Sequence, residues 1–214
     1  MPRPNHCRSG CMRDYRHLDG YLDQLSVDIY AQPPDKYHQE LMWDVIQKWI
    51  GQLKVRSVLD VGCGQGESLG MLAQYATDVR GVTLGTDYEV CKQKGLAVER
   101  ADMSFLPYNP GEFDLIFARH ALEHSPMPLL TLMEWRRVSK QWLILIVPSL
   151  SAFEWYGLNH YYVLLPPQWV GLIERAGWKI VMQEDSQGEF EHRFLCEVTD
   201  DRNPKGFKTH PKDA

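Results

Sequence analysis

Apolar positions along the chain follow two alternating periods, and this alternation predicts the fold class. From Lys36 to Leu53, apolar residues recur every three or four positions, which is the spacing of one buried helix face. Beyond that helix, short apolar runs alternate with amphipathic segments. The runs predict buried strands at 57–61, 79–84, 97–102, 113–118 and 142–147, and the segments between them predict helices at 67–75, 87–94 and 129–138.

The predicted strands are apolar on both faces, which is typical of a parallel sheet covered by helices on each side. A further helix is expected from Pro166 to Ala176, followed by strands at 178–183 and 192–199. Right-handed crossovers between parallel strands favour a doubly wound arrangement. The predicted fold is therefore α/β, with a doubly wound, mostly parallel seven-stranded sheet and helices on both faces.

Length and charge limit the classes of protein that fit this sequence. The 214 residues are enough for one domain, predicted at 36–200, with a partly irregular extension at 1–35 and a basic tail at 201–214. The longest apolar run, 142–147, is far shorter than the roughly 20 residues that cross a bilayer, so no membrane insertion is expected. A net charge of −5 argues against binding nucleic acid through bulk positive charge.

The cysteines and the first residues bear on location. Five cysteines scattered along the chain do not form a disulfide framework, and the first twenty residues hold no apolar signal-peptide core, so a cytoplasmic protein is expected. Cys7 and Cys11 lie near His6 and His17 but lack a second cysteine pair. We therefore interpret them as part of a terminal segment and not as a metal clip.

A glycine-rich turn follows the first predicted strand. The pattern D-x-G-x-G-x-G is formed by Asp60, Gly62, Gly64 and Gly66, with Cys63 inside it. Glycines allow a tight turn and let a ligand approach the backbone. The third glycine comes one residue earlier than in the G-x-G-x-x-G fingerprint of dinucleotide sites. A carboxylate at position 60 suits an ammonium group better than a diphosphate, so the turn indicates a ligand other than a dinucleotide.

On these motifs the sequence resembles the class I S-adenosylmethionine-dependent methyltransferases, particularly the small members called type 11, over about residues 36–199. The resemblance implies that the glycine turn holds the methionine part of S-adenosylmethionine, with Asp60 near its ammonium group. It also implies that Asp102 contacts the adenine amino group and that Met103 packs on the ring. We assign Arg119, at the end of the fourth predicted strand, to the same cofactor site.

One position departs from the family pattern. Members usually end the second strand with an acid that holds both ribose hydroxyls, whereas this chain has Thr83 there. A threonine hydroxyl carries no charge and donates only one hydrogen bond. Either Thr83 makes a weaker ribose contact or Asp87 replaces the missing acid. An ordinary helix-capping role for Asp87 is the alternative.

The fourth predicted strand is followed by an H-x-x-E-H motif made of His120, Glu123 and His124. On a helix this spacing would place the two histidines one turn apart on the same face. The motif matches an inverted zinc-peptidase signature, but its place directly after a buried parallel strand argues against peptidase chemistry. We expect His120 to act as a base toward the methyl acceptor, with Glu123 and His124 orienting it.

A metal site is the alternative at this position. Certain methyltransferases that act on hydroxyls carry E-x-x-E-H here together with a later histidine, and they use a divalent ion. The matching residues are His120, Glu123, His124 and His160. A histidine in place of the first acid suits magnesium poorly, so the metal-free base is the preferred hypothesis. The aromatic segment 153–162 is expected to form either a lid over the strand ends or an irregular part of the core.

The expected activity is transfer of a methyl group from S-adenosylmethionine to an O or N nucleophile, which leaves S-adenosylhomocysteine. The acceptor is expected to be a small molecule or a sugar, RNA stays open, and the protein is expected to be a monomer or a homodimer. Two alternatives come from other classes: a protein that binds the cofactor without catalysis, and an NAD-type Rossmann oxidoreductase.

Overall fold

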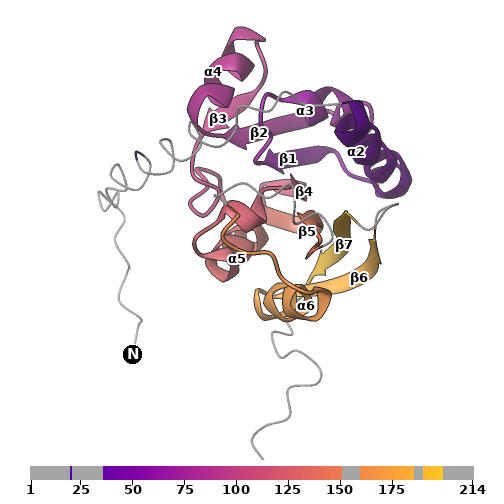
Figure 1. Cartoon of the computed structure of the whole chain (residues 1–214). Coiled ribbons are helices and arrows are strands. Elements are labelled where there is room, and N and C mark those ends of the chain that lie inside the picture. Colours follow the sequence, from indigo (N-terminus) through magenta and orange to yellow (C-terminus); the bar gives the residue numbers. More distant parts are fainter. Residues whose placement is uncertain (1–19, 21–35, 151–159, 186–189, 200–214) are drawn as a thin grey trace, which may run out of the picture.

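The structure, a computed structural model, describes residues 20, 36–150, 160–185 and 190–199. In that part a seven-stranded sheet lies between helices (Figure 1). The strands are β1 (Ser57–Val61), β2 (Asp78–Thr83), β3 (Val98–Arg100), β4 (Phe113–Arg119), β5 (Ser139–Pro148), β6 (Trp178–Asp185) and β7 (Glu191–Val198).

The helices also lie where the sequence predicts them. They are α2 (Lys36–Trp49), α3 (Glu67–Leu72), α4 (Gly85–Gln93), α5 (Pro128–Val138) and α6 (Pro166–Arg175), with short 3-10 turns η1 (Ile50–Gln52) and η2 (Leu122–His124). The predicted α/β fold class is confirmed. Two predicted segments lie outside the described residues: the extension at 1–35, apart from residue 20, and the tail at 201–214. Cys7, Cys11, His6 and His17 belong to that extension.

The strand order is β3-β2-β1-β4-β5-β7-β6, and all pairings from β3 to β5 are parallel. β7 runs antiparallel between β5 and β6. The chain reverses its direction of winding between β1 and β4. In open α/β sheets the crevice at the carboxyl ends of the strands beside such a switch point is where ligands bind.

Alternate residues of the central strands supply two separate cores, which explains why these strands are apolar throughout. On β4, Ile116 packs in the core beneath α5 and α6, whereas Leu115 and Phe117 pack in the core beneath α2 and α3. β5 divides in the same way, with Leu145 on the first side and Ile146 on the second. Because successive side chains of a strand point to opposite faces, burial on both faces requires helices on both.

One prediction about local structure is wrong. The H-x-x-E-H motif does not lie on an α-helix, because His120 has a left-handed backbone conformation with φ 49° and only Leu122–His124 form a 3-10 turn. A left-handed residue interrupts the right-handed helical path. The two histidines therefore do not lie one α-helical turn apart on one face.

None of the helices in the described part of the chain is long and apolar enough to cross a bilayer. Of the cysteines in that part, Cys63, Cys91 and Cys196 are buried free thiols.

The turn between α6 and β6 contacts α5 through Arg136, which also contacts the residue after β7. Gly177 has φ 89°, and its carbonyl accepts a hydrogen bond from Arg136 Nε of α5 at 2.9 Å. Arg136 also donates to the carbonyl of Thr199 at 2.8 Å. A Cβ atom at position 177 would lie 2.6 Å from Arg136 Nε. The contact between α5 and the end of β7 thus depends on a residue without a side chain.

The variant Gly177→Ala is expected to lower the free energy of unfolding by about 3 kcal/mol, because it combines left-handed strain of about 1 to 2 kcal/mol with displacement of the Arg136 bonds. Urea denaturation measures this loss. Gly111→Ala is the control, since Gly111 is also left-handed, with φ 63°, but its added Cβ would meet only Lys140 Cγ at 3.7 Å. Equal losses in the two variants would contradict the role given to Arg136.

Candidate active site

The glycine turn joins β1 to α3 through three left-handed glycines, Gly62, Gly64 and Gly66, with φ of 81°, 53° and 85°. The turn is fixed to the next strand, because the backbone N–H groups of Gly62 and Cys63 donate to the carbonyl of Val82 at 2.9 and 3.1 Å. The backbone N–H of Gly66 donates to the carbonyl of Cys63 at 2.9 Å. Left-handed residues in succession are strained for any residue other than glycine, so the sequence pattern and the turn geometry agree.

Two of these glycines are required by close packing. A Cβ at Gly62 would lie 2.6 Å from the Cβ of Ala121, and a Cβ at Gly66 would lie 2.4 Å from Leu96 Cδ1. Gly64 differs, because the nearest atom to its would-be Cβ is Asp87 Oδ2 at 3.9 Å. Packing against the described residues therefore does not explain a glycine at position 64. Space beside a left-handed glycine is what a cradle for a ligand backbone requires.

The contact between Gly62 and Ala121 has a further consequence for the site. Ala121 directly follows His120, so the glycine turn and the H-x-x-E-H segment touch at the carboxyl ends of β1 and β4. The two motifs that the sequence singles out are thus neighbours in space.

Asp60 lies at the end of β1, beneath the start of α3. Its side chain is buried, and its carboxylate accepts a hydrogen bond from the hydroxyl of Ser68. Burial raises the pKa of Asp60 to about 7, although the Ser68 bond and the charge of Arg119 act in the opposite direction. A cation bound beside this carboxyl group would lower its pKa, because a positive charge stabilises the ionised form.

The residues assigned to the adenosine part lie on both sides of the glycine turn. Thr83 is buried at the end of β2, whereas Asp87 is half-buried in the first turn of α4 and faces Gly64. Burial raises the pKa of Asp87, while a hydrogen bond with Gln65 lowers it. Of the two ribose candidates, Asp87 is the one whose side chain lies next to the open space at Gly64.

Asp102 and Met103 follow β3 and also have contacts within the protein. Asp102 is buried, and its Oδ1 accepts the backbone N–H of Ser104 at 2.6 Å. The carbonyl of Met103 accepts the indole N–H of Trp135 at 3.0 Å, while its side chain packs against the core beneath α5 and α6. These bonds hold the segment after β3 against α5.

Arg119 and His120, at the end of β4, share a partner that the sequence analysis does not include. Oε1 of Glu191 on β7 accepts from Arg119 Nε at 2.9 Å, from Arg119 Nη2 at 2.5 Å and from His120 Nε2 at 2.9 Å. The left-handed backbone of His120 is held by a bond from its N–H to the carbonyl of Ile146 at 3.0 Å. An uncommon conformation in a histidine, held in place from two sides, indicates a functional position.

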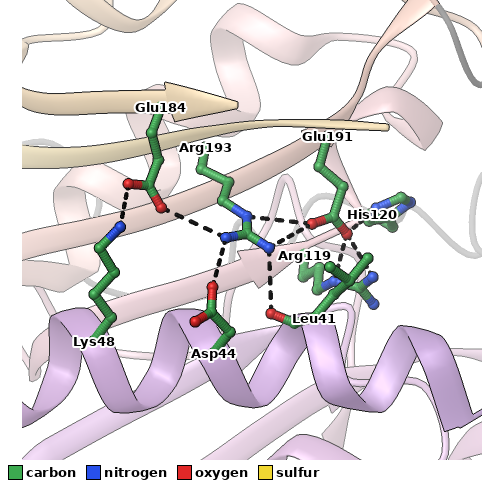
Figure 2. A network of polar contacts seen from close by, with 8 residues as sticks. All are labelled: Leu41, Asp44, Lys48, Arg119, His120, Glu184, Glu191 and Arg193. Carbon is green, nitrogen blue, oxygen red and sulfur yellow. Dashed lines mark hydrogen bonds and ion pairs between the residues drawn. The ribbon is translucent and has the colours of Figure 1, made fainter. Parts of the chain in front are cut away.

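Figure 2 shows that this contact is one end of a network that reaches α2. Arg193 of β7 contacts Glu191 Oε2 at 3.4 Å and Asp44 of α2 at 3.0 Å. Arg193 also lies 3.5 Å from Glu184 of β6, which pairs with Lys48 of α2 at 2.5 Å. Polar contacts therefore link β7 and β6 to α2, which precedes both strands by more than 100 residues in the sequence.

Glu123, His124 and His160 come together on the other side of His120. Each offers one ligand atom, and these atoms all lie within 4.8 Å of one another. Glu123 is fully buried, and within the described residues neither of its carboxylate oxygens has a hydrogen-bond partner. Burial raises its pKa to about 8. Burial also lowers the pKa of His160 to about 4, with the nearby charge of His120 acting in the same direction.

The predicted metal set is therefore brought together in part. The group of ligand atoms comprises Glu123, His124 and His160 without His120, whose Nε2 is bound to Glu191 and whose Nδ1 is 3.7 Å from Glu123 Oε1. The loop that carries His160 is fixed to η2, since the backbone N–H groups of Tyr161 and Tyr162 donate to the carbonyl of Glu123 at 2.9 and 3.2 Å. Residues 153–159 of the predicted aromatic lid lie outside the described residues.

A family model described as a methyltransferase domain matches residues 59–146, which include the glycine turn and the H-x-x-E-H motif. The chain is 34% identical over 93 residues to the ubiquinone biosynthesis O-methyltransferase of Methylococcus capsulatus, a stretch that covers 40% of this chain and 39% of that protein. The chain thus spans about two fifths of the length of this curated relative.

Solved structures resemble the whole fold. The magnesium protoporphyrin IX methyltransferase of Synechocystis, with bound S-adenosylhomocysteine, matches with a TM-score of 0.65 and 16% identity, over 87% of this chain and 100% of that one. An S-adenosylmethionine-dependent methyltransferase from Archaeoglobus fulgidus matches with a TM-score of 0.61 and 18% identity, over 74% and 94% of the two chains. Residues 59–146 thus match the type 11 methyltransferase domain, and the fold around them is that of class I S-adenosylmethionine-dependent methyltransferases.

Proposed function

We propose that the protein transfers a methyl group from S-adenosylmethionine to an O or N nucleophile of an acceptor molecule. The observation that carries this proposal is the contact between the glycine turn and the segment after β4, made by Gly62 and Ala121. It puts a cradle suited to the cofactor directly beside His120. When bound, the cofactor supplies a sulfonium-activated methyl group, so the protein has mainly to position the acceptor and remove a proton.

The chain's own residues fit this cofactor at two ends. At the methionine end, Gly64 offers open space and Asp60 offers a buried carboxyl that a cation would ionise. At the ribose, Asp87 supports the assignment better than Thr83, because its carboxylate faces Gly64. We assign Asp102 to the adenine amino group and Met103 to the ring. We keep Arg119 in the cofactor site, and the effect of its charge on Asp60 supports that assignment.

On the acceptor side, we assign proton removal to His120. It follows β4 at the carboxyl edge, and it is one-quarter exposed whereas Glu123 beside it is fully buried. Histidine can accept a proton near neutral pH. Glu123 and His124 are then residues that shape and orient the site. A small molecule or a sugar is the acceptor class we propose, and RNA is the other arm of an acceptor screen that measures S-adenosylhomocysteine formation.

A second version of the acceptor site has one observation in its favour. The carboxyl group of Glu123 is buried without a hydrogen-bond partner in the described part of the chain, and a buried polar group of that kind is normally hydrogen-bonded or bound to a metal. Together with His124 and His160 it would offer one oxygen and two nitrogen ligands, a set that suits zinc better than magnesium. Such an ion would orient the accepting oxygen.

The role of Gly64 is tested by Gly64→Ala. A side chain there would occupy the open space of the cradle, so the affinity for S-adenosylmethionine is expected to fall at least about a hundredfold, which corresponds to about 2.7 kcal/mol. Isothermal titration calorimetry measures this loss. Gly95→Ala is the matched control, because Gly95 is left-handed with φ 70° and no atom of the described residues lies within 4 Å of its would-be Cβ. Wild-type affinity in Gly64→Ala would remove the cofactor from this turn.

The pKa of Asp60 gives the binding reaction a pH dependence of known sign. With a pKa of about 7, the carboxyl is mostly neutral at pH 6 and mostly ionised at pH 8. The ammonium group of the cofactor prefers the ionised form, so the affinity is expected to be about tenfold higher at pH 8 than at pH 6. Asp60→Asn should bind weakly and without this dependence. Methylthioadenosine, which lacks the ammonium group, is the control ligand, and the same pH dependence with it would exclude Asp60 as the cause.

His120→Asn separates the two versions of the acceptor site, and asparagine is chosen because it tolerates a left-handed backbone. As a metal-free base, His120 is expected to contribute about a hundredfold to turnover, so the variant should lose that factor with cofactor affinity unchanged, and a chelator should have no effect. Turnover that a chelator abolishes, with zinc binding lost in His160→Ala, would establish the metal version instead. Full turnover in His120→Asn and in chelated enzyme would contradict both.

A further inference from the structure

Glu191 lies where two arginines, Arg119 of β4 and Arg193 of β7, converge with His120. Its Oε1 accepts from Arg119 and His120, and its Oε2 lies 3.4 Å from both Nε and Nη2 of Arg193 (Figure 2). Ile146 of β5 pairs with Arg119 on one side and with Arg193 on the other. The three strands therefore present these side chains at the same level of the sheet.

The contacts around Glu191 define which nitrogen of His120 carries the proton. Burial alone would raise the pKa of the Glu191 carboxyl, but the His120 bond and the charges of Arg119 and Arg193 hold it well below its usual range. The carboxylate is thus ionised and can only accept hydrogen bonds. The hydrogen in its 2.9 Å contact with His120 must therefore be on Nε2. In a neutral imidazole the proton-accepting nitrogen is then Nδ1.

We propose that Glu191 is the positioning residue of the acceptor site: it fixes His120 as the Nε2–H tautomer and turns Nδ1 toward the side of the ring where Glu123 lies. This inference rests on the function proposed above, since it specifies the atom with which His120 would remove a proton. The place of Nδ1, 3.7 Å from Glu123 Oε1, is consistent with that orientation. A carboxylate that holds one ring nitrogen so that the other can act as base is an arrangement that recurs on unrelated folds.

Glu191 is itself held in place by Arg193. The side chain of Arg193 is 3% exposed, and besides Glu191 it contacts Asp44 and the carbonyl of Leu41, both on α2. A buried guanidinium with fixed partners leaves the carboxylate little freedom to rotate. The orientation of His120 thus depends on residues of β7 and α2 that lie far from it in the sequence.

The direct test is the tautomer of His120, measured by long-range 1H–15N correlation spectra of the protein labelled at histidine nitrogens. The signal is assigned by its loss in His120→Asn. The wild-type protein is expected to show Nε2–H, and Glu191→Gln to show a mixture of tautomers, because an amide can donate as well as accept. Glu197→Gln is the matched control, since Glu197 is on the same strand and contacts Gln141. Nδ1–H in the wild type, or an unchanged tautomer in Glu191→Gln, overturns the proposal.

If thermal unfolding shows that Glu191→Gln does not fold, Arg193→Lys replaces it in this experiment. Lysine keeps the positive charge but loses the two-nitrogen contact with Glu191, so a shift of the tautomer signal in the same direction is expected. If both Arg193→Lys and Glu191→Asp fold and neither shifts the tautomer signal, the proposal is wrong. Glu191→Asp retains the charge but withdraws the carboxylate by one methylene group.

Kinetics with an acceptor from the screen provide a second readout. Glu191→Gln is expected to lower kcat about tenfold to a hundredfold with the KM for S-adenosylmethionine unchanged. If Glu191 acts through His120, the double variant should lose no more than His120→Asn alone. Additive losses overturn the positioning role. A protein that does not bind S-adenosylmethionine refutes the proposed function but leaves the tautomer result to be judged separately.

Discussion

Glu191 is almost completely inaccessible to solvent, and a carboxylate buried so deeply is stable only where positive charges surround it. Arg119 and Arg193 meet that condition, but each of them is nearly buried as well and needs its own compensation. Arg193 finds it in Asp44 and Glu184. The balance of charge therefore extends from the end of β4 across β7 to α2, and removing Glu191 would take away the partner that Arg119 and Arg193 share.

Three buried acids at the same edge of the sheet show how strongly this balance depends on position. Glu191 has two arginines in contact, and its pKa is lowered. Asp60 and Glu123 experience Arg119 only as a neighbouring charge, and burial raises the pKa of both. The same kind of side chain is thus an anion on one side of Arg119 and close to neutral on the other.

The sequence predicted the part of this arrangement that depends on local patterns. Runs of apolar residues placed every strand to within a few residues, because both faces of the sheet are covered and the pattern is therefore uninterrupted. The glycine turn was also predictable, since left-handed backbone at Gly62, Gly64 and Gly66 restricts the residue type. The helix expected at the H-x-x-E-H motif was wrong, because the left-handed conformation of His120 is imposed by its contacts with β5 and β7.

Glu191 and Arg193 could not be placed in the site from the sequence, since their role depends on β7 lying beside β5. The signal that was available is that two charged residues, Glu191 and Arg193, directly precede the apolar run 194–196 of a predicted strand. Only the strand order turns that signal into a site, because it brings residues about 70 positions apart to the same level of the sheet.

The interior position of β7 has a consequence for how the protein is made. Chains fold from the N-terminus as they are synthesised. The parallel strands β1, β2 and β4, with the glycine turn, are available as soon as residues 57–119 have emerged, whereas β5 keeps an open edge and β6 has no neighbour until residues 191–198 arrive. The half of the site assigned to the cofactor can therefore assemble early, and the half that orients His120 is completed only when the strand in the gap has been inserted.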